Sequence, residues 1–148
     1  MNLLTGNKKK VVLCKISAGF SGGTLEYSPR AQAMGMFYLK AYCLANPAIA
    51  RHYDIEVAYY SVEQPVRGIT EALAGMEPDI LGLSCYNSDY EVSVQVGREM
   101  KERRPEMRVV LGGPNMSDPE NEMRKLEFAD VIVPFEGELP FGEYLVSL

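Results

Sequence analysis

The chain has 148 residues and a formal net charge of −5, and 47% of its residues are hydrophobic and 24% charged. This length suits a single domain, and the composition excludes a disordered or fibrous chain. The one compact basic cluster, Lys8 to Lys10, precedes the first apolar run. Because the net charge is negative and the sequence has no second basic patch, we expect no nucleic-acid partner. No apolar run approaches the roughly 20 residues of a membrane span, so we expect no membrane association.

Five short runs rich in β-branched residues alternate with helical stretches. The first run, 10–16, leads into a Gly/Ser-rich loop at 17–24 and then into a helix at 30–44, which Ser28 and Pro29 would begin. The other expected strands are 55–62, 79–84, 108–111 and 131–133, and the other expected helices are 65–74, 90–104, 119–128 and 140–148. With neither a linker nor an internal repeat among them, we treat residues 1–148 as one domain.

Strands that are separated by helices run parallel with right-handed crossovers, which predicts an α/β fold. Five such strands are best accommodated by a flavodoxin-like, doubly wound parallel sheet in the order 2-1-3-4-5. Sheets of this kind bind ligands beyond the carboxyl ends of their strands, where the order reverses between strands 1 and 3. The functional loops are therefore expected at 17–24, 84–90, 112–117 and 134–138.

Two of these loops carry candidate residues. Gly112 and Gly113 lack Cβ atoms, so a flat ligand could approach their backbone closely, although a tight turn forced by Pro114 explains the same glycines. Glu136 and Glu138 lie where the last helix begins, and the helix dipole alone accounts for Glu138. A catalytic pair of carboxylates is the alternative, but the sequence offers no partner histidine or metal cluster for it.

The cysteines Cys14, Cys43 and Cys85 are widely separated, and His52 is the one histidine. No pair has CxxC spacing, so we expect no zinc or iron–sulfur site within this chain. An odd number of cysteines in a chain that needs no disulfide favours reduced thiols and a cytoplasmic location.

Three runs of sequence, followed by the acidic turn at 136–138, point to a known family when they are taken together. The runs are 79–84 (DILGLS), 109–114 (VVLGGP) and 129–133 (ADVIV). In this order and spacing they resemble the N-terminal cobalamin-binding domain of class B radical S-adenosylmethionine (SAM) enzymes. The segment 35–42 (GMFYLKAY) is similar to the glycine-led aromatic helix of that domain, and the resemblance covers most of the chain.

The resemblance implies that cobalamin rests on the strand ends while its nucleotide tail enters between strands 1 and 3. Ser84 would hydrogen-bond in the tail pocket, and Gly112 and Gly113 would let the tail pass. The cofactor-binding residues that it implies are Ser17, Ala18, Gly19, Phe20, Ser84, Tyr86, Asn87, Gly112, Gly113, Pro114, Asn115, Phe135, Glu136 and Gly137.

The chain departs from the cobalamin domains of methionine synthase and the mutases, because its loop after the first strand has no Asp-x-His-x-x-Gly motif. His52 precedes the second strand, at the opposite end of the expected sheet. The cofactor expected here is therefore base-off and histidine-off, with cobalt shielded by the loop from Ser17 to Phe20 or by Tyr86 and Asn87.

The radical enzymes hold a four-iron cluster with a Cys-x-x-x-Cys-x-x-Cys motif, which this sequence does not contain. The resemblance thus implies that the cluster and SAM belong to a further C-terminal domain, supplied in cis or in trans. The chain is expected to be the N-terminal part of a longer enzyme, a methyltransferase, and to hold a corrinoid without being catalytic alone.

Two other functions stay open at this point. The loop at 17–24 could hold a phosphate through backbone N–H groups, as in a flavodoxin-like FMN protein, although several residues separate it from the next helix. An interaction module that has lost its cofactor is the other alternative. A phospho-receiver domain is disfavoured, because the first strand ends in Lys15-Ile16-Ser17 without the acidic pair that would hold magnesium.

Overall fold

A computed structural model describes residues 7–18 and 32–148 of the chain. Its strands form one parallel sheet in the order β2-β1-β3-β4-β5, which confirms the predicted fold class and strand order. The strands are β1 (Lys9–Ser17), β2 (Tyr53–Ser61), β3 (Ile80–Ser84), β4 (Arg108–Gly112) and β5 (Val131–Val133). The helices are α2 (Met34–Leu44), α3 (Pro47–His52), α4 (Val66–Gly75), α5 (Tyr90–Arg103), α6 (Pro119–Lys125) and α7 (Glu138–Ser147), with a 3₁₀ turn, η2, at Pro114–Met116.

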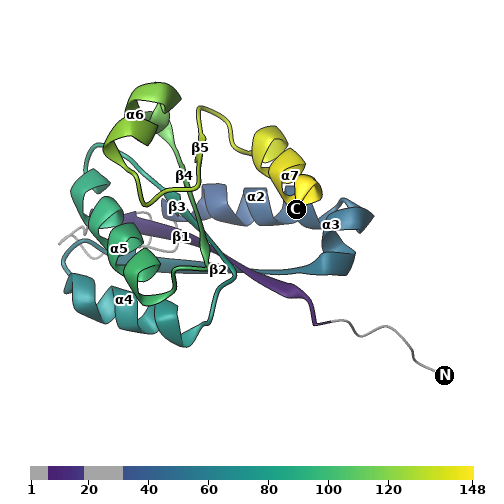
Figure 1. Cartoon of the computed structure of the whole chain (residues 1–148), viewed down its shortest axis with the longest axis horizontal. Helices are drawn as coiled ribbons and strands as arrows, with labels where there is room; N and C mark the ends of the chain where they lie inside the picture. Colours follow the sequence, from purple (N-terminus) through teal and green to yellow (C-terminus); the bar gives the residue numbers. More distant parts are fainter. Residues whose placement is uncertain (1–6, 19–31) are drawn as a thin grey trace.

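Helices cover both faces of the sheet, as Figure 1 shows. Because side chains alternate along a strand, β1 supplies both layers of core. Val12, Cys14 and Ile16 pack in the layer under α4 and α5, whereas Val11 and Leu13 pack in the layer under α2, α3 and α7. The central strands are apolar on both faces, as buried parallel strands are expected to be.

The helices differ from the sequence prediction mainly at their ends. The predicted start of α2, including Ser28 and Pro29, lies outside the described residues. The short helix α3 was not predicted, although its start has a clear cause: the Asn46 side chain accepts a hydrogen bond of 3.0 Å from the Ala48 amide, and Pro47 takes the first helical position. The predicted end of α6 at residue 128 was wrong, since the helix ends at Lys125.

The final helix begins two residues earlier than predicted, at Glu138 instead of residue 140. Pro140 tolerates this position because a proline in the first turn of a helix has no intrahelical hydrogen bond to lose. Within the described residues, no helix combines the length and the apolar character that a membrane crossing requires.

Candidate functional site

A cavity of about 250 Å³ opens at the carboxyl ends of β1, β3 and β4, on the face of the sheet that α2 and α7 cover. The strand register explains why there is space here. One row across the sheet pairs Leu13 with Gly82 and Gly82 with Val110, and the next row pairs Lys15 with Ser84 and Ser84 with Gly112. Gly82 and Ser84, at the middle of the two rows, have no side chain or a small one, so the space above this part of the sheet is not filled. This is the switch point, where the topology predicts a ligand.

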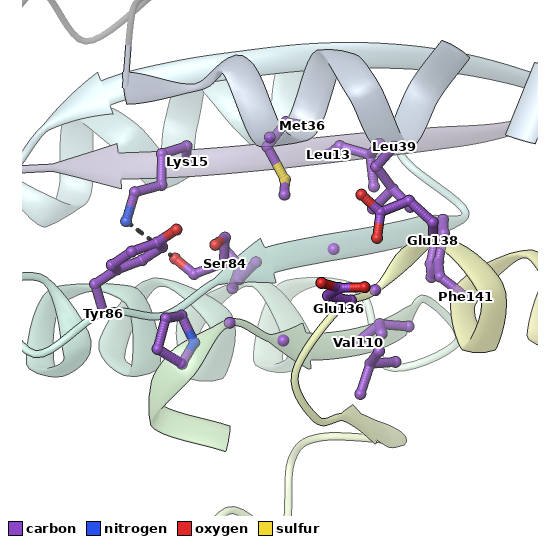
Figure 2. A pocket seen from close by; sticks show the side chains of 18 of the residues that line it. Leu13, Lys15, Met36, Leu39, Ser84, Tyr86, Val110, Glu136, Glu138 and Phe141 are labelled. Carbon is purple, nitrogen blue, oxygen red and sulfur yellow. Dashed lines mark hydrogen bonds between the residues drawn. The ribbon is translucent and has the colours of Figure 1, made fainter. Parts of the chain in front are cut away.

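The inner walls of this cavity are apolar and its mouth is polar. Met36 and Leu39 of α2 and Phe141 of α7 line it together with the floor residues. Figure 2 shows Glu136 and Glu138 reaching from the β5–α7 segment toward the same space, across from α2 and β1. An apolar slot with charged groups at its entrance suits a flat, largely apolar group that carries a polar extension.

The two adjacent glycines after β4 have different structural roles. Gly113 has a φ of +99°, and a Cβ built on it would lie 2.6 Å from the carbonyl oxygen of Cys85. A Cβ on Gly112 would meet the Val133 carbonyl oxygen at 3.4 Å, an ordinary contact. The backbone conformation of Gly113 therefore requires glycine whatever the cavity holds. That Gly112 and Gly113 leave room for a ligand stays a prediction.

A buried ion pair that the sequence reasoning missed lies at the mouth of the cavity. The Lys15 ammonium contacts the Asp89 carboxylate, and Lys15 is 5% exposed and Asp89 2% exposed. The same ammonium donates to the Ser84 carbonyl oxygen at 3.5 Å, drawn as a dashed line in Figure 2, and lies 3.9 Å from the centre of the Tyr86 ring. A lysine inside the otherwise apolar strand 11–16 was the sequence signal for this pair.

Many of the predicted site residues do line this cavity. They are Ser84, Tyr86, Gly112, Gly113, Pro114, Phe135, Glu136 and Gly137. Asn87 is exposed and Asn115 belongs to η2, and neither lines it. The apolar lining residues Leu13, Met36, Leu39, Val110 and Phe141 were not predicted, because a sequence does not distinguish them from ordinary core residues.

The predicted residues after β1 are only partly described. Ser17 is buried at the end of β1, and among the described residues its hydroxyl oxygen has no hydrogen-bond partner. The Ala18 carbonyl oxygen accepts a hydrogen bond of 3.4 Å from the Gln32 side chain. Gly19 and Phe20 lie outside the described residues. Neither Ser17 nor Ala18 lines the cavity.

The described residues contain no group of three or more histidine, cysteine or acidic side chains that could hold a metal ion. All three cysteines are buried free thiols. His52 is the last residue of α3 and lies next to the amino end of β2, where Tyr53 pairs with Lys9. The predicted position of this histidine, at the edge of the sheet opposite the cavity, is confirmed.

Comparison with known proteins gives one family and several relatives. A family model described as the B12-binding domain matches residues 24–145. Over 111 residues the chain is 37% identical to 2-(S-pantetheinyl)-carbapenam-3-carboxylate methyltransferase of Streptantibioticus cattleyicolor, and over 110 residues it is 36% identical to the cobalamin-dependent radical SAM methyltransferase TokK of Streptomyces tokunonensis. Each match covers 74% of this chain and 16% of the relative, so the chain spans about a sixth of their length.

A crystal structure of a cobalamin-binding protein from Desulfitobacterium hafniense shares the fold. Its TM-score is 0.56 at 17% identity, and the match covers 92% of this chain and 56% of that one. The family model and the two methyltransferases confirm the resemblance that the sequence motifs predicted, and this structure confirms the fold.

Proposed function

Because the chain belongs to the B12-binding domain family, we propose that it holds cobalamin in a base-off, histidine-off state for a radical SAM methyltransferase. Cobalamin is the cofactor of the family, and the cavity under α2 is the observation that carries the rest of the proposal. In the base-off state the nucleotide tail leaves the metal, so it needs a separate slot that is apolar inside and polar at its entrance.

The lining residues fit such a tail. Leu39, Val110 and Phe141 offer apolar contacts for a planar base, and Gly82 and Gly112 keep the floor of the slot low. Ser84 suits the polar extension, as a donor or an acceptor. The corrin ring is rimmed by primary amides, whose N–H groups would find acceptors in the carboxylates of Glu136 and Glu138.

The residues of this chain would bind and orient the cofactor, and bound cobalamin would supply the methyl-transfer chemistry through its cobalt. Tyr86 and Pro114, which line the cavity beside the ends of β3 and β4, would contact the corrin ring. We infer a histidine-off state because His52 lies beside the amino ends of the strands, whereas the cavity lies at their carboxyl ends.

The methyltransferase assignment is supported by the two curated relatives, which are both methyltransferases. We propose that residues 1–148 act as the cobalamin-binding part of a longer enzyme, and that a radical SAM domain in cis or in trans supplies the iron–sulfur cluster and SAM. We also propose a cytoplasmic setting, which the three buried free thiols support.

The direct test is reconstitution with hydroxocobalamin, followed by desalting and a visible absorption spectrum. We expect the corrinoid to be retained at about one per chain. FMN is the matched control, and we expect no retention of it, because the family model that matches the chain describes a B12-binding domain. Retention of FMN without retention of any corrinoid would overturn the proposal.

A further inference from the structure

We propose that Lys15 is a positioning residue whose buried ammonium holds the Tyr86 ring at the cavity mouth, in the orientation that packs against a bound corrinoid. This inference rests on the proposed function. It concerns residues whose contacts are formed before any ligand arrives.

The first step of the argument is the environment of the lysine. Burial of an ammonium is costly unless each of its protons finds a partner. Lys15 has three described partners within the segment 84–89: the Asp89 carboxylate, the Ser84 carbonyl oxygen and the face of the Tyr86 ring. These partners match the three donors of an ammonium, so this lysine ties the end of β1 to the segment between β3 and α5.

Asp89 holds the same segment from the other side. Its second carboxylate oxygen accepts the Tyr86 backbone N–H at 2.9 Å and the Ser93 hydroxyl at 3.3 Å. The backbone of Tyr86 is thus fixed by Asp89, and its ring is fixed by Lys15. The pair therefore restrains Tyr86 at its backbone N–H and at one face of its ring.

The ring that is held in this way is still available to a ligand. Tyr86 is 46% exposed and lines the cavity. Because the ammonium covers one face of the ring, the accessible surface belongs to the opposite face and the edge. An aromatic ring fixed before binding loses less side-chain entropy when a ligand packs on it, and this raises affinity without any new contact.

A purely structural role would not require charges. Buried ion pairs are on average no more stabilising than apolar pairs of similar volume, and the neighbouring side chains of this strand are apolar. The specific gain from an ammonium here is a cation–π contact, which is directional and strengthens when water is excluded.

The test is a double-mutant cycle on hydroxocobalamin affinity. Lys15→Met/Asp89→Asn removes both charges and leaves an acceptor for the Tyr86 amide, and Tyr86→Ala removes the ring. Given the strength of a desolvated cation–π contact, we expect the charge-free variant to bind about 3- to 30-fold more weakly than the parent. The triple variant should bind no more weakly than Tyr86→Ala, because a positioning residue has no effect once its target is absent.

Two measurements separate this role from general stability. Tyr86→Phe keeps the ring and its cation–π contact, so it should restore most of the affinity that Tyr86→Ala loses. Each variant is also unfolded in urea, which shows whether affinity simply follows stability. If the charge-free variant does not fold, Lys15→Gln takes its place, since its neutral amide can still donate to Asp89.

The outcomes are distinct. Parental affinity in the charge-free variant, or additive losses in the triple variant, would overturn the positioning role. Failure of the parent to retain hydroxocobalamin would instead overturn the proposed function and leave the contacts of Lys15 as structural ones.

Discussion

Gly113 lies against the backbone of Cys85, so closely that a Cβ on Gly113 would come within 2.8 Å of the Cys85 nitrogen and 2.6 Å of its carbonyl oxygen. Hydrogen bonds join the two loops at this place. The Cys85 amide donates to the Gly112 carbonyl oxygen at 2.7 Å, and the Asn115 amide donates to the Cys85 carbonyl oxygen at 3.3 Å. The loops after β3 and β4 therefore form one unit at the edge of the cavity.

This contact predicts that alanine substitutions at these two adjacent glycines have different effects on stability. Gly113→Ala combines an unfavourable φ with a backbone clash, and we expect it to lower the free energy of unfolding by about 1–3 kcal/mol. Gly112→Ala meets only ordinary contacts, so it should change that free energy by less than about 0.5 kcal/mol. Urea unfolding followed by circular dichroism measures both, and equal losses would contradict the distinction between the two glycines.

A larger side chain at Gly112 should affect the ligand more than the fold. Gly112→Leu would project into the floor of the cavity, beside Ser84 and Val133. We expect it to fold and to bind hydroxocobalamin at least about tenfold more weakly, since the tail would lose its space. Gly68→Leu, at an open and exposed position on α4, is the matched control and should bind like the parent. Equal affinity of both variants would place the tail elsewhere.

The sequence predicted the sheet well because β-branched runs separated by helices leave few topologies. It did not predict α3, since six residues carry too little periodicity and only Asn46-Pro47 marks the start. The polar rim of the cavity was predicted because loop residues at the switch point are conspicuous. The apolar wall was not, since Leu39 and Phe141 belong equally to a core or to a pocket.

The Lys15–Asp89 pair shows a different limit. Its two members are 74 residues apart, and only the parallel pairing of β1 with β3 brings them together. In the sequence, Lys15 is simply a lysine within a strand and Asp89 is simply a residue that precedes a helix, so neither indicates an ion pair. The strand register is what makes them one unit at the site.

Asp130 should stabilise the fold through its charge. Burial opposes ionisation of this carboxyl, but hydrogen bonds from the Val109 amide at 2.7 Å and from Lys101 at 2.9 Å outweigh it and lower the pKa of Asp130 from its usual 3.8. A lowered pKa stabilises the fold above pH 4, and this stabilisation is lost as the pH falls below that value. Asp130→Asn should therefore cost about 1–3 kcal/mol at pH 7 and much less at pH 3.

Urea unfolding at both pH values tests this prediction. Asp54→Asn is the matched control, because the Asp54 carboxylate is largely exposed and its ion pair among the described residues is with Lys8, at 3.5 Å. Its effect should stay below about 1 kcal/mol. A cost of Asp130→Asn that is the same at pH 3 and pH 7 would show that the charge is not the cause.

The cysteines should be unreactive in the folded protein. Burial raises the pKa of the Cys43 thiol to about 11, that of Cys85 to about 12, and that of Cys14 further still, all from an ordinary value of 9.0. Since only the thiolate reacts, iodoacetamide at pH 8 should label the native protein slowly and all three thiols in urea. The raised pKa values favour the fold below pH 9, and we expect stability to fall as the pH rises from 9 toward 11. Rapid labelling of the native protein would contradict these assignments.

His52 should have no part in binding the metal. A ligand to cobalt has to reach it from the carboxyl edge of the sheet, and His52 directly precedes Tyr53 at the amino end of the nine-residue strand β2. Such a strand spans about 26 Å, which no imidazole side chain can bridge. His52→Ala should thus leave both the affinity for cobalamin and its visible spectrum unchanged.

Electron paramagnetic resonance of the cob(II)alamin form gives the strictest test, because an axial nitrogen splits each cobalt line into three. We expect that each cobalt line stays unsplit in the parent and in the variant alike. A triplet that disappears in His52→Ala would require the histidine to lie at the cavity, in conflict with the strand register.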